Sequence, residues 1–239
     1  MKIINIVNSI LRKIEKSKTI RNISVVYFGE ILPKIFLVLS TIILIRSFSE
    51  SEYATYTIFT SIASVLMSLI GSGLNSALVR FSSEELSITG KKPYSLYLST
   101  FSIEVLFYFS LSSIIYFNSS KVSGVLFGNT RYIEIIPISL LFGFGSLLLG
   151  FGKSILKSEQ RFSLYSFILS VVSFLFLIYI VILNIRSEIA FRTVALGYSV
   201  IYLFSGFIIT ILCFKEIGSH KELGFSFNTE GTSFIEYIS

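Results

Sequence analysis

Two charged residues, Glu30 and Lys34, interrupt the first long apolar stretch of the sequence. A spacing of four residues places them on one face of a helix, and Pro33 between them removes a backbone hydrogen bond and can kink that helix. A charge at the centre of a bilayer costs about 2.5 to 3.5 kcal/mol, whereas each leucine returns only about 0.3 to 0.6 kcal/mol. We therefore expect both side chains to face the interior of a helical bundle or a water-filled path. The alternative is a self-contained ion pair in which Lys34 extends towards the cytoplasmic membrane surface.

A second acidic residue, Glu104, lies midway along another apolar stretch. Tyr97, Thr100 and Tyr108 share its side of a helix, because they are four or seven residues away from it. We expect Glu104 to be buried within the bundle. Ionisable residues in such positions usually mark the path of a substrate or an ion.

Small polar residues follow one face of the stretch 54–79 at steps of three and four. Small side chains let two helices approach closely, so helix packing is the favoured interpretation of this face. The alternative is that the face lines a water-filled cavity. The residues are Thr57, Thr60, Ser61, Ser64, Ser68, Ser72 and Asn75.

The residue types argue against several kinds of catalytic site. A single cysteine, Cys213, and a single histidine, His220, provide neither an intrachain disulfide nor a Cys/His metal cluster. The glycines of 143–152 look superficially like a phosphate-binding loop, but no strand precedes them and the segment is apolar and helical in character. Tight helix packing explains these glycines better. The sequence offers no Ser/His/Asp triad, so we expect no enzyme, no catalytic residue, no metal and no cofactor.

The composition is that of a membrane protein. Hydrophobic residues make up 53% of the 239, the mean hydropathy is +0.79, and only 14% of residues are charged. An ordinary soluble domain has about a quarter of its residues charged. The net charge of +6 would suit a nucleic-acid partner only if the basic residues gathered on one face of a folded domain. They lie between apolar runs instead, so we expect a lipid bilayer as partner and no nucleic acid.

Six apolar stretches are long enough to cross a bilayer as helices. About 22 residues at 1.5 Å each reach roughly 33 Å, which matches a hydrocarbon core of about 30 Å with some tilt. The connecting segments are short, which favours antiparallel neighbours. We predict an all-α, multi-pass membrane bundle with spans at 24–45, 54–79, 94–117, 132–152, 162–183 and 193–214.

Basic residues are distributed unequally between the two sides of this bundle. Of the 20 lysine and arginine residues, 14 fall on the side of the N-terminus and five on the other, with Lys34 inside the first span. By the positive-inside rule both ends of the chain face the cytoplasm. Residues 1–23 are interpreted as a basic amphipathic helix on the inner leaflet, with a disordered basic tail as the alternative. Residues 215–239 turn apolar again at their end, and we interpret them as a cytoplasmic linker into a truncated seventh span.

The stretch 46–80 reads RSFSESEYATYTIFTSIASVLMSLIGSGLNSALVR and resembles polysaccharide (O-antigen type) flippases of the multidrug/oligosaccharidyl-lipid/polysaccharide exporter superfamily. In that family a first span with Glu and a basic residue leads to an A-R-x-L-G-P-x-E-Y-G turn and a second span ending in G-L-x-S-A-L-V-R. The turn departs from this pattern, with Ser49, Glu50 and Ala54 where Gly, Pro and Gly are usual. The matching residues are Glu30, Lys34, Arg46, Glu52, Tyr53, Gly73, Leu74, Ser76, Ala77, Leu78, Val79 and Arg80, with Gln160, Arg161, Phe162 and Tyr165 at the start of the fifth span.

The resemblance covers nearly the whole chain, but only the N-terminal half of such a transporter. It implies one lobe of a two-lobed flippase in the bacterial inner membrane, which moves polyprenyl-diphosphate-linked oligosaccharides by alternating access for surface polysaccharide synthesis. Lys34 would then contact the phosphates, and Arg80 and Arg161 would attract them at the cytoplasmic mouth. Glu30 would hold Lys34 or exchange a coupling cation, and Glu104 would be a second proton or sodium site.

Several alternatives stay open. An ion-coupled drug antiporter of the same superfamily fits Lys34 less well, because its cavity should be acidic. A membrane-embedded polymerase, ligase or glycosyltransferase usually carries a sizeable external loop or acidic loop motifs, and the loops here are short. A non-transporting membrane component or an inactive fragment is the fourth reading. A single lobe has only half a cavity, so we expect it to need a second half or a second copy of itself.

Overall fold

The computed structural model describes residues 18–127 and 133–218, and within this part of the chain every regular element is a helix. The predicted all-α multi-pass bundle is confirmed. The predicted helix at 1–23 lies mostly outside the described residues, and 219–239 lie wholly outside them. The helices are α2 (Lys18–Ser47), α3 (Glu50–Thr89), α4 (Tyr94–Phe117), α5 (Ser119–Phe127), α6 (Ile135–Ser158), α7 (Phe162–Ile185) and α8 (Phe191–Gly218).

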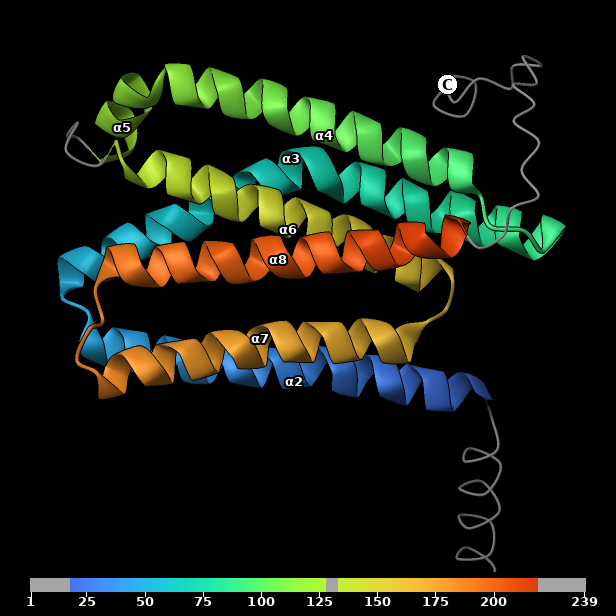
Figure 1. Ribbon diagram of the computed structural model, residues 1–239, viewed down its shortest axis with the longest axis horizontal. Coiled ribbons are helices and arrows are strands. Elements are labelled where there is room, and N and C mark those ends of the chain that lie inside the picture. Colours follow the sequence, from blue (N-terminus) through green and yellow to red (C-terminus); the bar gives the residue numbers. More distant parts are fainter. Residues whose placement is uncertain (1–17, 128–132, 219–239) are drawn as a thin grey trace, which may run out of the picture.

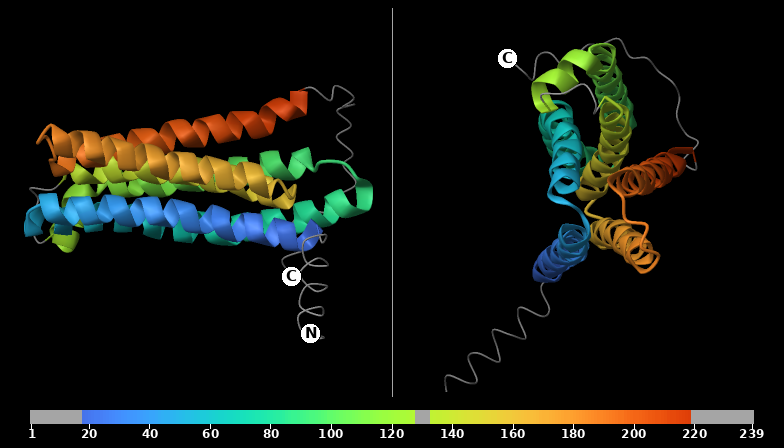
Figure 2. Two further views of the ribbon diagram at one scale, coloured as in Figure 1. Left: turned by 90° about the horizontal axis from the view of Figure 1, so that it is seen from below. Right: turned by 90° about the vertical axis from the view of Figure 1, so that its left-hand side faces the viewer.

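The long helices run alternately in opposite directions along one axis (Figure 1). The α3–α4 and α6–α7 connections lie at the end where α2 begins, and the α2–α3 and α7–α8 connections lie at the opposite end. In the view along the axis, α6 lies at the centre (Figure 2). It packs chiefly against α8 and α3, while α2 packs chiefly against α7.

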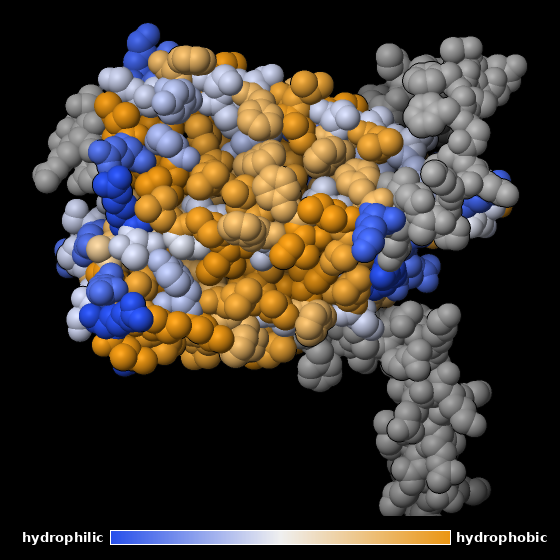
Figure 3. All heavy atoms as spheres, viewed as in Figure 1, coloured by the Kyte–Doolittle hydropathy of each residue, from blue (hydrophilic) through white to orange (hydrophobic). Residues whose placement is uncertain are grey.

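Five helices are long and apolar enough to cross a membrane, judged by length and composition: α3, α4, α6, α7 and Phe191–Lys215 of α8. Hydrophilic residues gather at the two ends of the bundle, and hydrophobic residues cover the middle (Figure 3). Many large apolar side chains on this middle surface are exposed, as suits contact with lipid. The first predicted span, within α2, is not among the five, so a sixth span stays a prediction.

Helix α3 is 40 residues long, whereas the apolar pattern predicted a span over 54–79 only. It begins with a capping box, in which the Ser49 side chain accepts from the Glu52 backbone and the Glu52 carboxylate accepts from the Ser49 backbone. It ends at Gly90, which adopts the left-handed conformation that favours glycine. The region predicted as a loop after Val79 is therefore mostly helical, because polar residues can continue a helix beyond the apolar core of the bilayer.

The α6–α8 contact depends on glycines. A Cβ atom on Gly145 would lie 2.5 Å from the backbone nitrogen of Leu203, and one on Gly206 would lie 2.7 Å from the carbonyl oxygen of Gly145. Distances below about 3 Å are not found for real Cβ atoms, so the backbones approach as closely as glycine allows. The predicted packing role of the glycines in 143–152 is confirmed here.

Most of the small polar face of α3 is not packed against a neighbouring helix, contrary to the favoured interpretation, and only Thr60 and Asn75 of its seven residues are partly buried. Thr57, Ser61, Ser64, Ser68 and Ser72 are all exposed. Several of these hydroxyls donate to the carbonyl four residues earlier in α3, for example Ser72 to Ser68 at 2.6 Å. Such bonds satisfy the hydroxyl without a partner helix, which explains why the face can be left uncovered.

Candidate functional site

The chain reverses between α6 and α7 through a tight turn that concentrates charge. Gln160 has a φ of 57°, in the left-handed region. The backbone N–H of Arg161 donates to Leu156 at 2.9 Å, and that of Gln160 donates to Lys157 at 3.1 Å. This pair of bonds is a Schellman motif, which ends α6 and turns the chain directly into α7. Lys157, Glu159 and Arg161 are thereby brought to one end of the bundle.

Glu30 reaches this turn from α2. Its Oε1 lies 3.7 Å from the Nζ of Lys157 and accepts a hydrogen bond of 3.1 Å from the hydroxyl of Tyr165. The side chains of Glu30 and Lys157 are each 39% exposed, and the Lys157 ammonium lies 4.9 Å from the centre of the Tyr165 ring. Glu30 therefore joins α2, α6 and α7 at one point.

Lys34 does not take part in this contact. It is exposed on α2, so it does not lie in the interior of the bundle, and the described residues include no ion pair that involves it, so the alternative of a pair with Glu30 is not seen either. Its place on a water-filled path stays a prediction. Lys34 is exposed because of the buried stripe of α2, which passes through Gly29, Pro33 and Ser40 and packs on α7. A Cβ on Gly29 would collide with Ser166 of α7, so this contact is very close. Lys34 follows Pro33 and lies to one side of the stripe.

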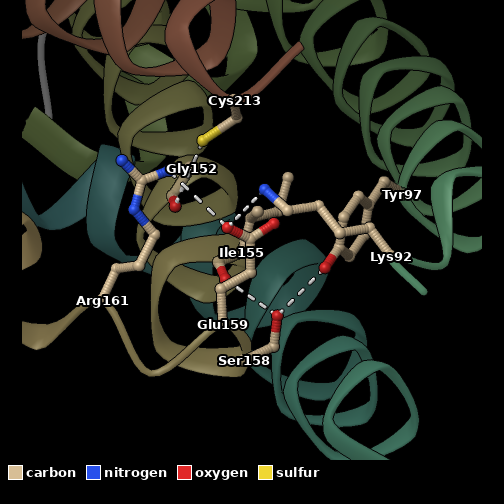
Figure 4. A network of polar contacts seen from close by, with 8 residues as sticks. All are labelled: Lys92, Tyr97, Gly152, Ile155, Ser158, Glu159, Arg161 and Cys213. Atoms are coloured by element: carbon tan, nitrogen blue, oxygen red, sulfur yellow. Dashed lines mark hydrogen bonds and ion pairs between the residues drawn. The ribbon is translucent and has the colours of Figure 1, made fainter. Parts of the chain in front are cut away.

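Glu159 organises the other charges at this end, as Figure 4 shows. Its carboxylate lies 2.9 Å from the Lys92 ammonium and 3.7 Å from the Arg161 guanidinium, and its side chain is only 7% exposed. Lys92 lies in the segment between α3 and α4, so the interaction fixes that segment to the end of α6. Beside it, the hydroxyls of Tyr97 and Ser158 are 3.4 Å apart and link α4 to α6.

Basic residues outnumber acidic ones around the α6–α7 turn. We define the basic cluster as Lys92, Lys153, Lys157 and Arg161, which faces the two carboxylates Glu30 and Glu159. Lys153 lies one turn before Lys157 on α6 and is partly buried. These six residues together carry a net charge of two positive units, which favours an anionic group as a ligand.

The other predicted site residues lie elsewhere. Arg80 is exposed on α3, with its guanidinium 5.9 Å from the ring of the adjacent Phe81, and no interaction of the described residues joins it to the basic cluster. Glu104 is fully buried on α4, as predicted, together with Tyr97, Thr100 and Tyr108. Of the five predicted residues, only Glu30 and Arg161 lie at the α6–α7 turn, where Glu30 contacts Lys157 and Arg161 contacts Glu159.

Sequence reasoning missed the partners that give this site its form. Lys153 and Lys157 entered only the count of basic residues that predicted orientation, and Glu159 was not singled out. Tyr165 entered only as part of a family pattern. The usable signal was the density of charge in 153–161, where three cations and one acid occur within nine residues between two apolar spans.

A small pocket lies at the opposite end of the bundle. It has a volume of about 210 Å³ and contains an ion pair between Arg192 and Glu134 at 3.5 Å. Ligand pockets usually measure about 300 to 1,000 Å³, so this one is too small for a bulky substrate. The described residues contain no group of three His, Cys, Asp or Glu side chains placed to hold a metal ion.

Comparison of the chain with protein-family models, with curated proteins and with solved structures finds no match.

Proposed function

We propose that this chain is one lobe of a membrane flippase that moves a polyprenyl-diphosphate-linked oligosaccharide across the cytoplasmic membrane by alternating access. The observation that carries the proposal is the basic cluster at the α6–α7 turn, where Lys157 lies 3.7 Å from Glu30 of the flanking helix α2 and Arg161 lies 3.7 Å from Glu159. A diphosphate that links a polyprenol to a sugar carries two negative charges and several acceptor oxygens, and ammonium and guanidinium groups are its usual partners.

The depth of the cations suits a lipid-linked anion. On α6, Lys153 lies one turn further into the bundle than Lys157, and on α2 Lys34 lies one turn further in than Glu30. Each step is about 6 Å along the axis. A diphosphate entering at the end of the bundle would meet Lys157 and Arg161 first and the two deeper lysines next.

Lys34 keeps its place in this proposal although it is exposed. An exposed ammonium within an apolar surface is costly in lipid but not in water. The hydroxyl-rich face of α3 is likewise exposed. Both features are explained if these surfaces border a watery path that a second lobe, or a second copy of the chain, completes.

The first test measures binding. The full chain in lipid nanodiscs is titrated with a polyprenyl diphosphate, and the bound lipid is counted by native mass spectrometry. We expect Lys157→Gln combined with Arg161→Gln to weaken binding at least tenfold, because each charge-assisted hydrogen bond contributes about 1.5 to 3 kcal/mol. The matched control is Lys121→Gln combined with Arg186→Gln, which removes two exposed cations at the opposite end.

Competing lipids give the test its specificity. We expect the diphosphate to bind more tightly than the corresponding monophosphate and than phosphatidylglycerol. Equal binding of all three lipids, or equal losses in the two double variants, would contradict the proposal and leave a cluster that only contacts anionic lipid headgroups. In a full-length transporter, Lys34→Ala should abolish export of the polymer, and normal export would remove Lys34 from the substrate path.

A second candidate is an ion-coupled antiporter of the same superfamily. The fully buried acid Glu104 favours it, since antiporters exchange cations at buried carboxylates. The basic cluster counts against a cationic drug as cargo. Tight binding of a lipophilic cation, with no binding of the polyprenyl diphosphate, would favour this candidate over the flippase.

A further inference from the structure

We propose that the pocket at the end of the bundle opposite the basic cluster binds the headgroup of a zwitterionic phospholipid of the phosphatidylethanolamine type, and that an acyl chain of this lipid lies along α8. The site is separate from the one that carries the proposed function. It does not depend on the identity of the cargo.

The pocket lies where three helices begin. It is lined by residues at the start of α3, α6 and α8, and this end of the bundle carries one of its two hydrophilic surfaces (Figure 3). The pocket is therefore at the level where lipid headgroups meet water. Its volume of about 210 Å³ exceeds the cavity of about 150 Å³ that holds benzene, so a compact headgroup fits where an oligosaccharide does not.

Two charged side chains of opposite sign stand side by side in this pocket. The Arg192 guanidinium lies 3.5 Å from the Glu134 carboxylate, and the two side chains are 72% and 76% exposed, so a ligand can reach both. A guanidinium binds phosphate through two parallel N–H donors, and a carboxylate accepts hydrogen bonds from an ammonium group. A phosphoethanolamine group carries a phosphate and an ammonium on a short linker, so it can pair with both residues at once.

Glu52 adds a second negative charge to the lining. Its carboxylate accepts hydrogen bonds from the backbone N–H and the hydroxyl of Ser49, at 3.0 and 2.9 Å, which fix it at the start of α3. One positive and two negative side chains give the lining a net charge of one negative unit. This charge disfavours an anionic lipid such as phosphatidylglycerol, in contrast to the basic cluster at the other end.

A ridge of exposed apolar side chains leads away from the pocket along α8. Leu196, Val200 and Phe204 follow Arg192 at steps of four residues, which form one ridge on a helix surface. Their exposed fractions are 39%, 42% and 64%. From Arg192 to Phe204 the ridge extends about 18 Å, compared with about 15 Å for the hydrocarbon of one leaflet. An acyl chain below a headgroup at Arg192 therefore has apolar surface along its length, and this favours a lipid over a soluble zwitterion.

The test compares ligands on the purified full chain in detergent. Phosphatidylethanolamine, phosphatidylglycerol and the soluble glycerophosphoethanolamine, which has the same headgroup but no acyl chain, are titrated separately, and native mass spectrometry measures the bound fraction. We expect phosphatidylethanolamine to bind about fivefold more tightly than phosphatidylglycerol, because exposed charges contribute little more than such a factor. Glycerophosphoethanolamine should bind more weakly than either lipid.

Variants assign the preference to the pocket and the ridge. Arg192→Gln combined with Glu134→Gln should make the two lipids bind equally. The matched control is Arg186→Gln combined with Glu188→Gln, which removes an exposed cation and an exposed anion between α7 and α8, outside the pocket. Leu196→Ser should weaken binding of phosphatidylethanolamine and leave that of glycerophosphoethanolamine unchanged.

Three results would overturn the proposal. Equal binding of the two lipids to the unmodified chain, or equal losses in the two double variants, would leave only general contact with the bilayer. Binding of glycerophosphoethanolamine as tight as that of the lipid would make the ligand a soluble zwitterion. The polyprenyl diphosphate titration depends on residues at the opposite end, so failure here leaves the test of the basic cluster unaffected.

Discussion

Glu30 and Glu104 are both acidic residues within helices of an apolar bundle, but the fold treats them in opposite ways. Glu30 is partly exposed and contacts Lys157 and Tyr165 on two other helices. Glu104 is fully buried, and neither of its carboxylate oxygens has a partner among the described residues. Glu30 helps to hold three helices together, whereas Glu104 places a carboxylate in the protein interior without a hydrogen bond to stabilise it.

The difference separates structural acids from acids that can bind an ion. A carboxylate whose oxygen already accepts a hydroxyl and faces an ammonium gains little from a further cation. A carboxylate that has neither partner gains much more binding free energy from a cation. Substitutions at the two positions should therefore change the free energy of unfolding by different amounts, and in one case in opposite directions.

Charge reversal should produce the largest contrast. We expect Glu104→Lys to lower the free energy of unfolding by about 3 to 5 kcal/mol, because it buries a larger cation without a paired anion. Glu30→Lys should cost only about 1 kcal/mol, because its neighbourhood is partly exposed and water screens the repulsion from Lys157. Thermal unfolding in detergent micelles, followed by circular dichroism, measures both. Equal losses would mean that the two environments are alike.

The hydrogen bond between Tyr165 and Glu30 should be measurable as a coupling energy. We expect a double-mutant cycle of Tyr165→Phe with Glu30→Gln to give about 1 kcal/mol, because the hydroxyl donates to a charged oxygen. Tyr179, whose hydroxyl donates to the Thr193 carbonyl, provides the control cycle. Tyr179→Phe and Glu30→Gln should be additive. If the control cycle gave a coupling energy as large as the Tyr165 cycle, the cycles would be reporting a general destabilisation of the bundle and not the hydrogen bond.

Replacing each acid by glutamine should change the stability of the protein in opposite directions at the two positions. Glu30→Gln should cost about 0.5 to 1 kcal/mol, because it removes the charge from a half-exposed ion pair. Glu104→Gln should leave stability unchanged or raise it by a similar amount, because it removes a negative charge that is buried without a partner. The same unfolding assay, run without added sodium, compares them. A clear loss for Glu104→Gln would indicate that a partner for this carboxylate has been overlooked.

The α6–α7 turn, which positions Tyr165 next to Glu30, should show the smallest effect. Gln160→Gly should stabilise the protein by about 0.5 kcal/mol, because glycine adopts the left-handed conformation without a Cβ penalty. Ser187, with a φ of 55° in the corresponding turn after α7, is the matched position. Ser187→Gly should have a similar effect. Only Gln160→Gly should alter the coupling between Tyr165 and Glu30, and an unchanged coupling would mean that the turn does not position them.

The bundle itself could be predicted from the sequence because each span is encoded by one continuous apolar stretch. The predicted stretch 94–117 matches α4 at both ends, and 162–183 matches α7 to within two residues. Errors arose where helices continue in polar sequence. Helix α3 runs ten residues past its predicted end, and α6 ends at Ser158 instead of 152. The short helix α5 between α4 and α6 was not predicted.

The candidate site was less predictable, because its contacts join helices. The spacing of Glu30 and Lys34 permitted an ion pair within one helix, but in the structure Glu30 pairs with Lys157, which lies 127 positions later in the sequence. No periodicity in either segment indicates that pairing. The burial of Glu104 could be predicted because Tyr97, Thr100 and Tyr108 repeat along the same helix face. Local patterns identified which faces are polar, and only the packing of helices determined which of them meet.

The length of α3 has a mechanical consequence. Its 40 residues span about 60 Å, roughly twice the thickness of a hydrocarbon core, and its C-terminal end projects beyond the neighbouring helices (Figure 2). A rigid rod anchored in the bundle behaves as a lever arm, so a tilt of about 10° would swing a tip some 40 Å from the pivot through about 7 Å. A spin label near Thr89 would thus magnify rocking that is barely visible within the bundle.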